Sequence, residues 1–208
     1  DPGRDIDEAS RLRATITDPQ FESYELLARA WAALAAGDLG SARAQAERAR
    51  SITDYFQPLA LPLAARAALW GGDPREADAA AATLDATTFW GPVLEADRLT
   101  ARAGVAALGG RGGEAMAGYR EALRAYRALG LEFDEALAVV DMATVLPTPE
   151  RDAQDVVTAV AATRETLTRL GARPLLARLD EAVASGPETS PGAPGPSIRP
   201  SGVVQSQA

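Results

Sequence analysis

The chain has 208 residues, a net charge of −8 and 47% hydrophobic residues, a balance typical of a globular protein that folds in water. It contains no Cys and no His, and all of its 21 basic residues are Arg. These absences exclude Cys-His and Ser-His-Asp nucleophiles, Schiff-base lysines, the phosphate-binding lysine of a P-loop and Cys/His zinc sites. We therefore expect no enzymatic activity, no metal and no cofactor.

Composition and charge also indicate the cellular compartment and the kinds of partner. No apolar run reaches the roughly 18 residues of a membrane span, and no signal peptide opens the chain, so we expect a cytoplasmic protein without membrane contact. The acidic balance disfavours direct binding of nucleic acid, because a polyanion is repelled by a negative surface. Since the chain opens with Asp1 instead of Met, we expect a fragment of a larger protein or a processed product.

An internal repeat organises most of the chain. The string AALAAGD at 32–38 returns as AALWGGD at 67–73 and, in a looser form, as AALGGRG at 106–112. The strings begin 35 and then 39 residues apart, which is the spacing of a repeated supersecondary unit. The pattern predicts helical hairpins stacked along the chain.

The turns inside these hairpins have a recognisable chemistry. Gly37 and Gly72 are expected to end a helix in the left-handed conformation. Asp38 and Asp73 are expected to cap the helix that follows, and Pro74 suits the first position of that helix. The glycine-rich loop 109–114 resembles a phosphate cradle, but no strand precedes it and no Lys completes it, so we interpret it as the next turn.

Each half-repeat has helical periodicity, with one apolar face per helix. In the first hairpin these faces contain Leu26, Leu27, Ala30, Ala33 and Leu34, then Leu39, Ala42, Ala46 and Ala49. In the third they contain Leu94, Ala101, Val105 and Leu108, then Met116, Tyr119, Leu123 and Tyr126. In the fourth they contain Phe133, Leu137 and Val140, then Ala153, Val156, Val160, Leu167 and Leu170. The 46 alanines explain how such helices approach closely, because Ala has a small side chain and high helix propensity.

We therefore predict an all-α fold, a solenoid of about four αα-hairpins over residues 19–184. Residues 1–18 are expected to be the end of an upstream repeat. A short last helix with Leu176, Leu179 and Val183 is expected to cap the solenoid. The Pro-, Gly- and Ser-rich tail 185–208 cannot form a core and is expected to be disordered.

The repeat resembles the tetratricopeptide repeat (TPR), which has small residues at fixed places around a Gly-Asp-like turn. The resemblance implies that the solenoid is a right-handed superhelix. The matching positions are Ala30, Gly37, Asp38, Ala42 and Ala49 in the first repeat, Ala65, Gly72, Asp73 and Ala77 in the second, Ala115, Tyr119 and Ala122 in the third, and Ala153 in the fourth. The chain departs from the family at Leu84, which replaces a small residue, and at Leu26 and Leu61, where the family usually has an aromatic residue.

A narrower resemblance comes from 119–130, 133–137 and 170–179, which are similar to the C-terminal helical repeats of large bacterial AAA-type ATPase regulators. Those proteins carry an adenylate/guanylate cyclase-type domain or a DNA-binding helix-turn-helix ahead of the ATPase. The resemblance implies that the repeats sense or recruit while other domains act.

The TPR resemblance also implies a partner site, because the first helices of TPR hairpins line a concave groove that binds peptides. Five residues on such helices have the side-chain types that dominate interfaces, namely Tyr24, Trp31, Arg66, Trp70 and Arg98. The alternative for Trp31 and Trp70 is packing between repeats. For Trp90, in the loop after the second hairpin, such packing is the favoured interpretation.

Two sets of charged residues have a functional and a simpler interpretation. Arg120, Arg124 and Arg127 share one helix face and could hold an acidic partner or a phosphate, but we favour a solvated face offset by the neighbouring acids Glu121, Glu132, Asp134 and Glu135. The scattered carboxylates Glu22, Glu25, Glu95, Asp97, Asp134 and Asp141 are also expected on the solvated surface.

The leading hypothesis is a non-catalytic protein-interaction or regulatory module of a bacterial signalling or transcription regulator. Its partner would be a protein, a peptide or a neighbouring domain of the parent chain, held in the concave groove. The alternative is a repeat domain that senses a small-molecule effector and controls an attached ATPase or cyclase.

Overall fold

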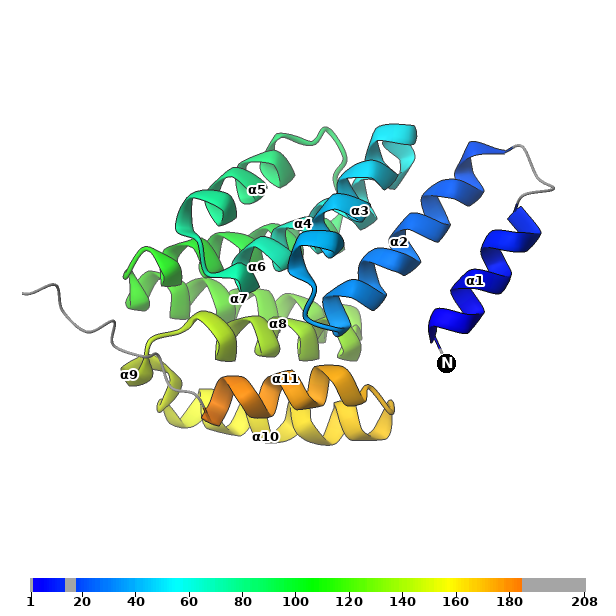
Figure 1. Cartoon of the computed structure of the whole chain (residues 1–208). Helices are drawn as coiled ribbons and strands as arrows, with labels where there is room; N and C mark the ends of the chain where they lie inside the picture. The colour runs from blue at the N-terminus through cyan, green and yellow to red at the C-terminus, as the bar shows by residue number, and fades with distance from the viewer. Residues whose placement is uncertain (1, 14–17, 185–208) are drawn as a thin grey trace, which may run out of the picture.

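The computed structural model describes residues 2–13 and 18–184, and within these residues all regular structure is helical, as predicted (Figure 1). The tail 185–208, predicted to be disordered, lies outside the described residues. The helices are α1 (Pro2–Arg13), α2 (Pro19–Ala35), α3 (Leu39–Ile52), the 3-10 turn η1 (Asp54–Phe56), α4 (Gln57–Gly71), α5 (Pro74–Ala86), α6 (Pro92–Leu108), α7 (Gly112–Leu129), α8 (Glu132–Val145), α9 (Thr148–Arg151), α10 (Gln154–Arg169) and α11 (Arg173–Ala184).

Neighbouring helices pack as pairs along the chain. α2 packs on α3, α4 on α5 and α6 on α7, while the short α9 separates α8 from its partner α10. The first helices of successive pairs also touch, α2 with α4, α4 with α6 and α6 with α8. Each hairpin therefore covers an apolar flank of the next, which is how repeated helix pairs form a common core.

The later helices return toward the centre of the molecule. α8 packs on α4 as well as on α6 and α7, and α11 packs on both α8 and α10. In Figure 1 α8 lies below α4 and α6, and α11 and α10 lie below α8. The face of α4 that points toward α8 is consequently covered by the chain itself.

The predicted turns are confirmed. Gly37 and Gly72 have φ values of 79° and 74°, the left-handed region that glycine adopts without steric penalty. The Asp38 carboxylate accepts a hydrogen bond from the Ser41 amide at 3.0 Å, and Asp73 accepts one from the Arg75 amide at 2.8 Å. Loop 109–114 is also the expected turn, because α6 ends at Leu108 and α7 begins at Gly112.

Small side chains close the first hairpin. Ala42, Ala46 and Ala49 of α3 are fully buried against α2, and the buried Ser23 hydroxyl donates to the Ala49 carbonyl at 3.2 Å. Alanine and serine leave so little volume between the helices that their backbones approach closely. The prediction of an alanine seam is therefore confirmed for this pair.

The apolar interior has a large cluster that runs from α2 to α11 and a small one among α4, α5 and α6. Gly104 of α6 belongs to a tight contact, since a Cβ at this position would lie 2.5 Å from Leu69 Cδ2 of α4. The final helix has a different register from the predicted one. Leu179 is fully buried as expected, but its buried neighbour is Leu175, and Val183 is 48% exposed.

None of the described helices combines the length and the apolar character that crossing a membrane requires.

Candidate functional site

The structure separates the five residues predicted to bind a partner. Arg66, Trp70 and Arg98 are buried, with 6 to 7% of each residue exposed. Trp31 is half-buried and its ring lies 6.2 Å from that of Phe133 on α8. Only Tyr24 is well exposed, at 53%. In this conformation a partner reaches the α2 residues but not the α4 and α6 residues.

Arg66 and Trp70 of α4 belong to a buried polar network with Asp141 of α8. The Arg66 Nε donates to both Asp141 carboxylate oxygens at 3.0 and 2.9 Å, and the Trp70 indole nitrogen donates to Oδ1 at 2.7 Å. These groups come from positions more than 70 residues apart in the sequence and are brought together by the packing of α8 on α4. The network links two helices and leaves no exposed charge.

The expectation of a solvated carboxylate is wrong for Asp141, which is fully buried. A charged carboxylate is tolerated in the protein interior only when hydrogen bonds and an opposite charge replace its lost hydration. Burial by itself lowers the pKa of Arg66, but the Asp141 carboxylate more than offsets this, so the pKa of the guanidinium lies above its usual value. Burial raises the pKa of Asp141, and the charge and hydrogen bond of Arg66 together with the Trp70 hydrogen bond oppose this rise.

A second acid, the half-buried Asp97, lies beside this pair on α6. The Tyr126 hydroxyl of α7 donates to the Asp97 carboxylate at 2.7 Å. Burial raises the pKa of Asp97 to about 6, against the opposing effects of the Tyr126 hydrogen bond and the Arg66 charge. Asp97 is thus only partly solvated, unlike the fully solvated carboxylate that was predicted, because α6 turns this residue toward Tyr126 of α7.

The last helix covers Trp70. The Arg178 guanidinium of α11 stacks 4.0 Å from the centre of the Trp70 ring, a cation–π geometry, and a terminal nitrogen donates to the Trp70 carbonyl at 3.5 Å. α11 therefore occupies the surface on which the sequence predicted a peptide partner.

Arg98 stabilises the connection between α5 and α6. Its guanidinium donates to the carbonyls of Leu84, Thr87 and Phe89 at 3.3, 3.1 and 3.0 Å, and it forms an ion pair with Glu95. These bonds fix the backbone of the loop that leads into α6. Phe89 packs inward against the small apolar cluster of α4, α5 and α6.

The next residue in this loop, Trp90, points to solvent. Its exposed fraction is 88%, so the interpretation that it packs between repeats is wrong. The direction follows from the loop, since Phe89 fills the apolar space below and Gly91 has a φ of 151°, which an L-residue rarely adopts. A large aromatic side chain is thus displayed on a backbone that Arg98 holds in place.

Other exposed aromatic rings lie on α2 and in the connection between α3 and α4. Tyr24 and Tyr55 meet the buried Phe56 edge to face, with ring centroids 4.7 and 5.5 Å apart. The Thr87 hydroxyl donates to the side chain of Gln57 at 2.8 Å, which ties the α5–α6 loop to the beginning of α4. In Figure 1 the start of α2, the α3–α4 connection and the α5–α6 loop follow one edge of the molecule. We call the exposed residues of this region the aromatic edge: Phe21, Tyr24, Tyr55, Leu59 and Trp90.

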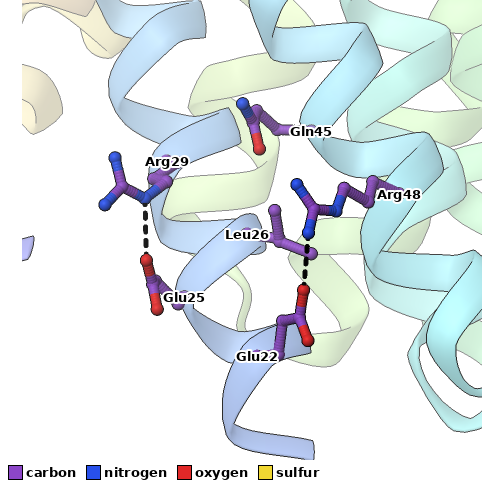
Figure 2. Close-up of a pocket in the computed structure, with 6 residues that line it drawn as sticks. All are labelled: Glu22, Glu25, Leu26, Arg29, Gln45 and Arg48. Carbon is purple, nitrogen blue, oxygen red and sulfur yellow. Dashed lines mark hydrogen bonds and ion pairs between the residues drawn. The ribbon is translucent and has the colours of Figure 1, made fainter. Parts of the chain in front are cut away.

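A polar cavity of about 270 Å³ lies between α2 and α3 (Figure 2). Two ion pairs line it, Glu25 with Arg29 at 3.0 Å and Glu22 with Arg48 at 2.7 Å. The Ser10 hydroxyl of α1 donates to Glu25 at 2.6 Å, so the same network connects α1 to α2. Since the two acids balance the two arginines, these pairs leave no net charge to attract an ion.

A larger cavity of about 370 Å³ lies near the end of α11, between α8, α9 and α10. Val156, Val157, Val160 and Val183 give it an apolar lining, with Arg151 and Arg164 at its polar side. Both arginines are occupied, Arg151 with the Ala182 carbonyl at 2.7 Å and Arg164 with Asp180 at 2.6 Å. This lining suits an apolar ligand better than a charged one.

The described part of the chain contains no group of three or more acidic residues arranged around a metal position. Comparison with protein-family models, with curated proteins and with solved structures gave no match. The structure itself defines the class: an all-helical protein of packed neighbouring helix pairs, with a polar network in its interior and aromatic side chains along one edge.

Proposed function

We propose that the chain is a TPR-like, right-handed superhelical repeat module that binds a protein partner and has no catalytic role of its own. The packing of first helices on one another, α2 to α4 to α6 to α8, supports this proposal. The half-buried Asp97 and the buried Asp141 support it as well, because their carboxylates are engaged by Tyr126, Arg66 and Trp70 of the protein itself.

The observation that carries the interaction role is the aromatic edge, above all Trp90 at 88% exposure. Trp and Tyr are enriched among the residues that contribute most to binding, since each buries a large area at a small entropy cost. Exposed apolar side chains that gather in one region mark sites of protein–protein contact. Because Arg98 fixes the loop before binding, little conformational entropy is lost when a partner docks.

This proposal changes the roles of the five predicted residues. Tyr24 contributes to the aromatic edge directly, and Trp31 lies farther along the same helix. Arg98 acts through the position of Trp90, while Arg66 and Trp70 stabilise the interior. A partner in the concave groove would have to displace α11 from Trp70, so contact at the aromatic edge requires the smaller rearrangement.

Affinity capture with variant baits tests this assignment. We expect the specific partner of the wild-type chain to be lost from Trp90→Ala and weakened by Tyr55→Ala. Leu170→Ala serves as the control, because Leu170 is also an exposed apolar residue, at 48%, but lies at the end of α10. If both edge variants retain the partner in full, the aromatic edge is not the binding site. If only Trp31→Ala loses the partner, the binding site is the concave groove predicted from the sequence.

We further propose that the module belongs to a cytoplasmic bacterial signalling or transcription regulator, in which it recruits a partner or contacts a neighbouring domain. The TPR-like and regulator-like sequence patterns are the basis for this context. The coding sequence upstream of Asp1 tests it: ATPase motifs together with a cyclase-type or helix-turn-helix domain would support the proposal, and a nearby start codon would contradict it.

Sensing of a small effector is the second candidate function, favoured by the 370 Å³ apolar cavity at α8, α9, α10 and α11. A ligand that binds the native state raises the unfolding midpoint by mass action. In a thermal-shift screen, Val157→Trp should abolish the effect of a true ligand, because Val157 lines the cavity. The control Val93→Trp changes a valine on α6 that is 42% exposed, against 49% for Val157. A ligand whose thermal shift neither substitution changes would bind elsewhere.

A further inference from the structure

The arginine stripe of α7 borders a groove that the proposed partner site does not include. Arg120, Arg124 and Arg127 line a cavity of about 230 Å³ between α7, α8 and α10. Its apolar lining comes from three helices, Met116 and Leu123 of α7, Met142 of α8, and Val156 and Ala159 of α10. The groove thus combines a cationic rim with an apolar floor.

The three guanidinium groups are not equivalent. Arg120 pairs with Asp155 of α10 at 2.7 Å, and Arg127 pairs with Glu135 of α8 at 2.6 Å. Arg124 lies between them in sequence and forms no ion pair or hydrogen bond with any side chain in residues 2–13 and 18–184. The groove therefore carries one uncompensated positive charge, in a chain whose net charge is −8.

We propose that this groove binds an acidic peptide segment of a partner protein through one apolar anchor side chain and flanking carboxylates. The volume is sufficient for one large side chain, and the two methionines can adapt to its shape because thioether side chains are flexible and polarisable. The Arg124 fork offers paired donors to a carboxylate.

The flanking ion pairs extend this complementarity. Arg120 and Arg127 are each more than half exposed, so their bonds to Asp155 and Glu135 contribute little to folding and can be shared with peptide carboxylates at small cost. A nucleic acid is disfavoured, because it offers no aliphatic side chain for the apolar floor of the groove.

The two methionines of the sequence, Met116 and Met142, both line this groove and therefore make it directly observable. The complete chain with ¹³C-methyl methionine is titrated with the peptide EDELLEDE, and fluorescence anisotropy of the labelled peptide gives its affinity. We expect both methyl resonances to shift. The peptides EDESSEDE, without the apolar anchor, and QNQLLQNQ, without charge, should bind at least fivefold more weakly, as expected for loss of about 1 kcal/mol.

Charge variants locate the contact. Arg124→Ala should weaken binding of EDELLEDE about fivefold and Arg124→Glu about tenfold, at the upper end for exposed charge pairs. Arg75→Glu is the matched control, because Arg75 is an exposed arginine on α5 whose side chain has no described ion pair. Equal weakening by Arg75→Glu, unshifted methyl resonances, or tighter binding of a single-stranded oligonucleotide that shifts the same resonances would each overturn the proposal.

Discussion

The first hairpin and the central helix pair of this protein are both tightly packed, but different chemistry joins them. α2 and α3 meet through fully buried methyl groups, those of Ala42, Ala46 and Ala49. α4 and α8 meet through the buried ion pair of Arg66 and Asp141. The alanine seam depends on the volume of each side chain, whereas the ion pair depends on each partner neutralising the other. The two regions should therefore respond differently to substitution.

The largest effect is expected from breaking the ion pair on one side. Asp141→Ala leaves the Arg66 guanidinium buried without its counter-charge, and such changes reduce the free energy of unfolding by about 3–5 kcal/mol. Urea denaturation measures this loss. The double variant Arg66→Met/Asp141→Leu removes both charges and should lose less than the single variant, since no charge is left uncompensated. A double variant as unstable as Asp141→Ala would show that volume, not charge, governs this interface.

The next effect concerns the acid beside that pair. The pKa of Asp97 rises from 3.8 to about 6 on folding, so the native state holds the proton more tightly than the unfolded state. The free energy of unfolding should therefore fall as pH rises from about 4 to 6, by at most about 3 kcal/mol. Asp97→Asn removes this dependence while keeping an acceptor for Tyr126. We expect the variant to gain stability over the wild type across this pH range in denaturation series. A constant difference would contradict the assignment.

The alanine seam should fail through volume instead. Ala46→Leu inserts three carbon atoms where α3 lies directly against α2, and overpacking of this kind costs about 1–3 kcal/mol. Ala44→Leu on the exposed face of the same helix is the control and should change stability little, because Leu and Ala have similar helix propensities. Chemical denaturation of the two variants at one pH compares them. Equal losses would mean that the seam tolerates larger side chains by moving apart.

The smallest effect is expected at a helix cap outside both interfaces. Asp73→Ala removes the acceptor for the amides of Arg75 and Glu76 and should cost about 1 kcal/mol. Asp78→Ala changes an exposed acid inside the same helix and provides the control for lost charge. A difference of less than a few tenths of a kcal/mol in thermal or urea unfolding would show that the capping bond adds nothing to stability.

The features that sequence reasoning identified are local ones. Gly37 and Gly72 end helices as predicted, and Asp38 and Asp73 cap the following ones, because these preferences depend on a few adjacent residues. The first seam was also predictable, since Ala42, Ala46 and Ala49 repeat at helical spacing. The recurrence of similar strings after 35 and then 39 residues indicated how often such hairpins follow one another.

The residues of the candidate sites were much harder to predict from the sequence. Trp90 and Phe89 are adjacent aromatics, and the sequence does not show which one fills the space beside α5. The bonds from Arg98 to the carbonyls before Trp90 use main-chain acceptors, which no pattern of side chains indicates. The order Phe89, Trp90 and Gly91 was the one available signal. A glycine directly after two aromatic residues allows a backbone conformation, here a φ of 151°, that separates the directions of their side chains.

The sequence by itself determined the helices, their caps and the methyl-lined contact of the first hairpin, because period, size and turn chemistry act within a few residues. Only the tertiary structure decided which charged and aromatic side chains are available to a partner. Arg66 and Asp141 lie 75 residues apart, and both are residue types that usually lie on the surface. The packing of α8 on α4 nevertheless makes them an interior pair. The reason is physical: burial of a charge is favourable only beside its counter-charge, and that neighbour is supplied by the fold.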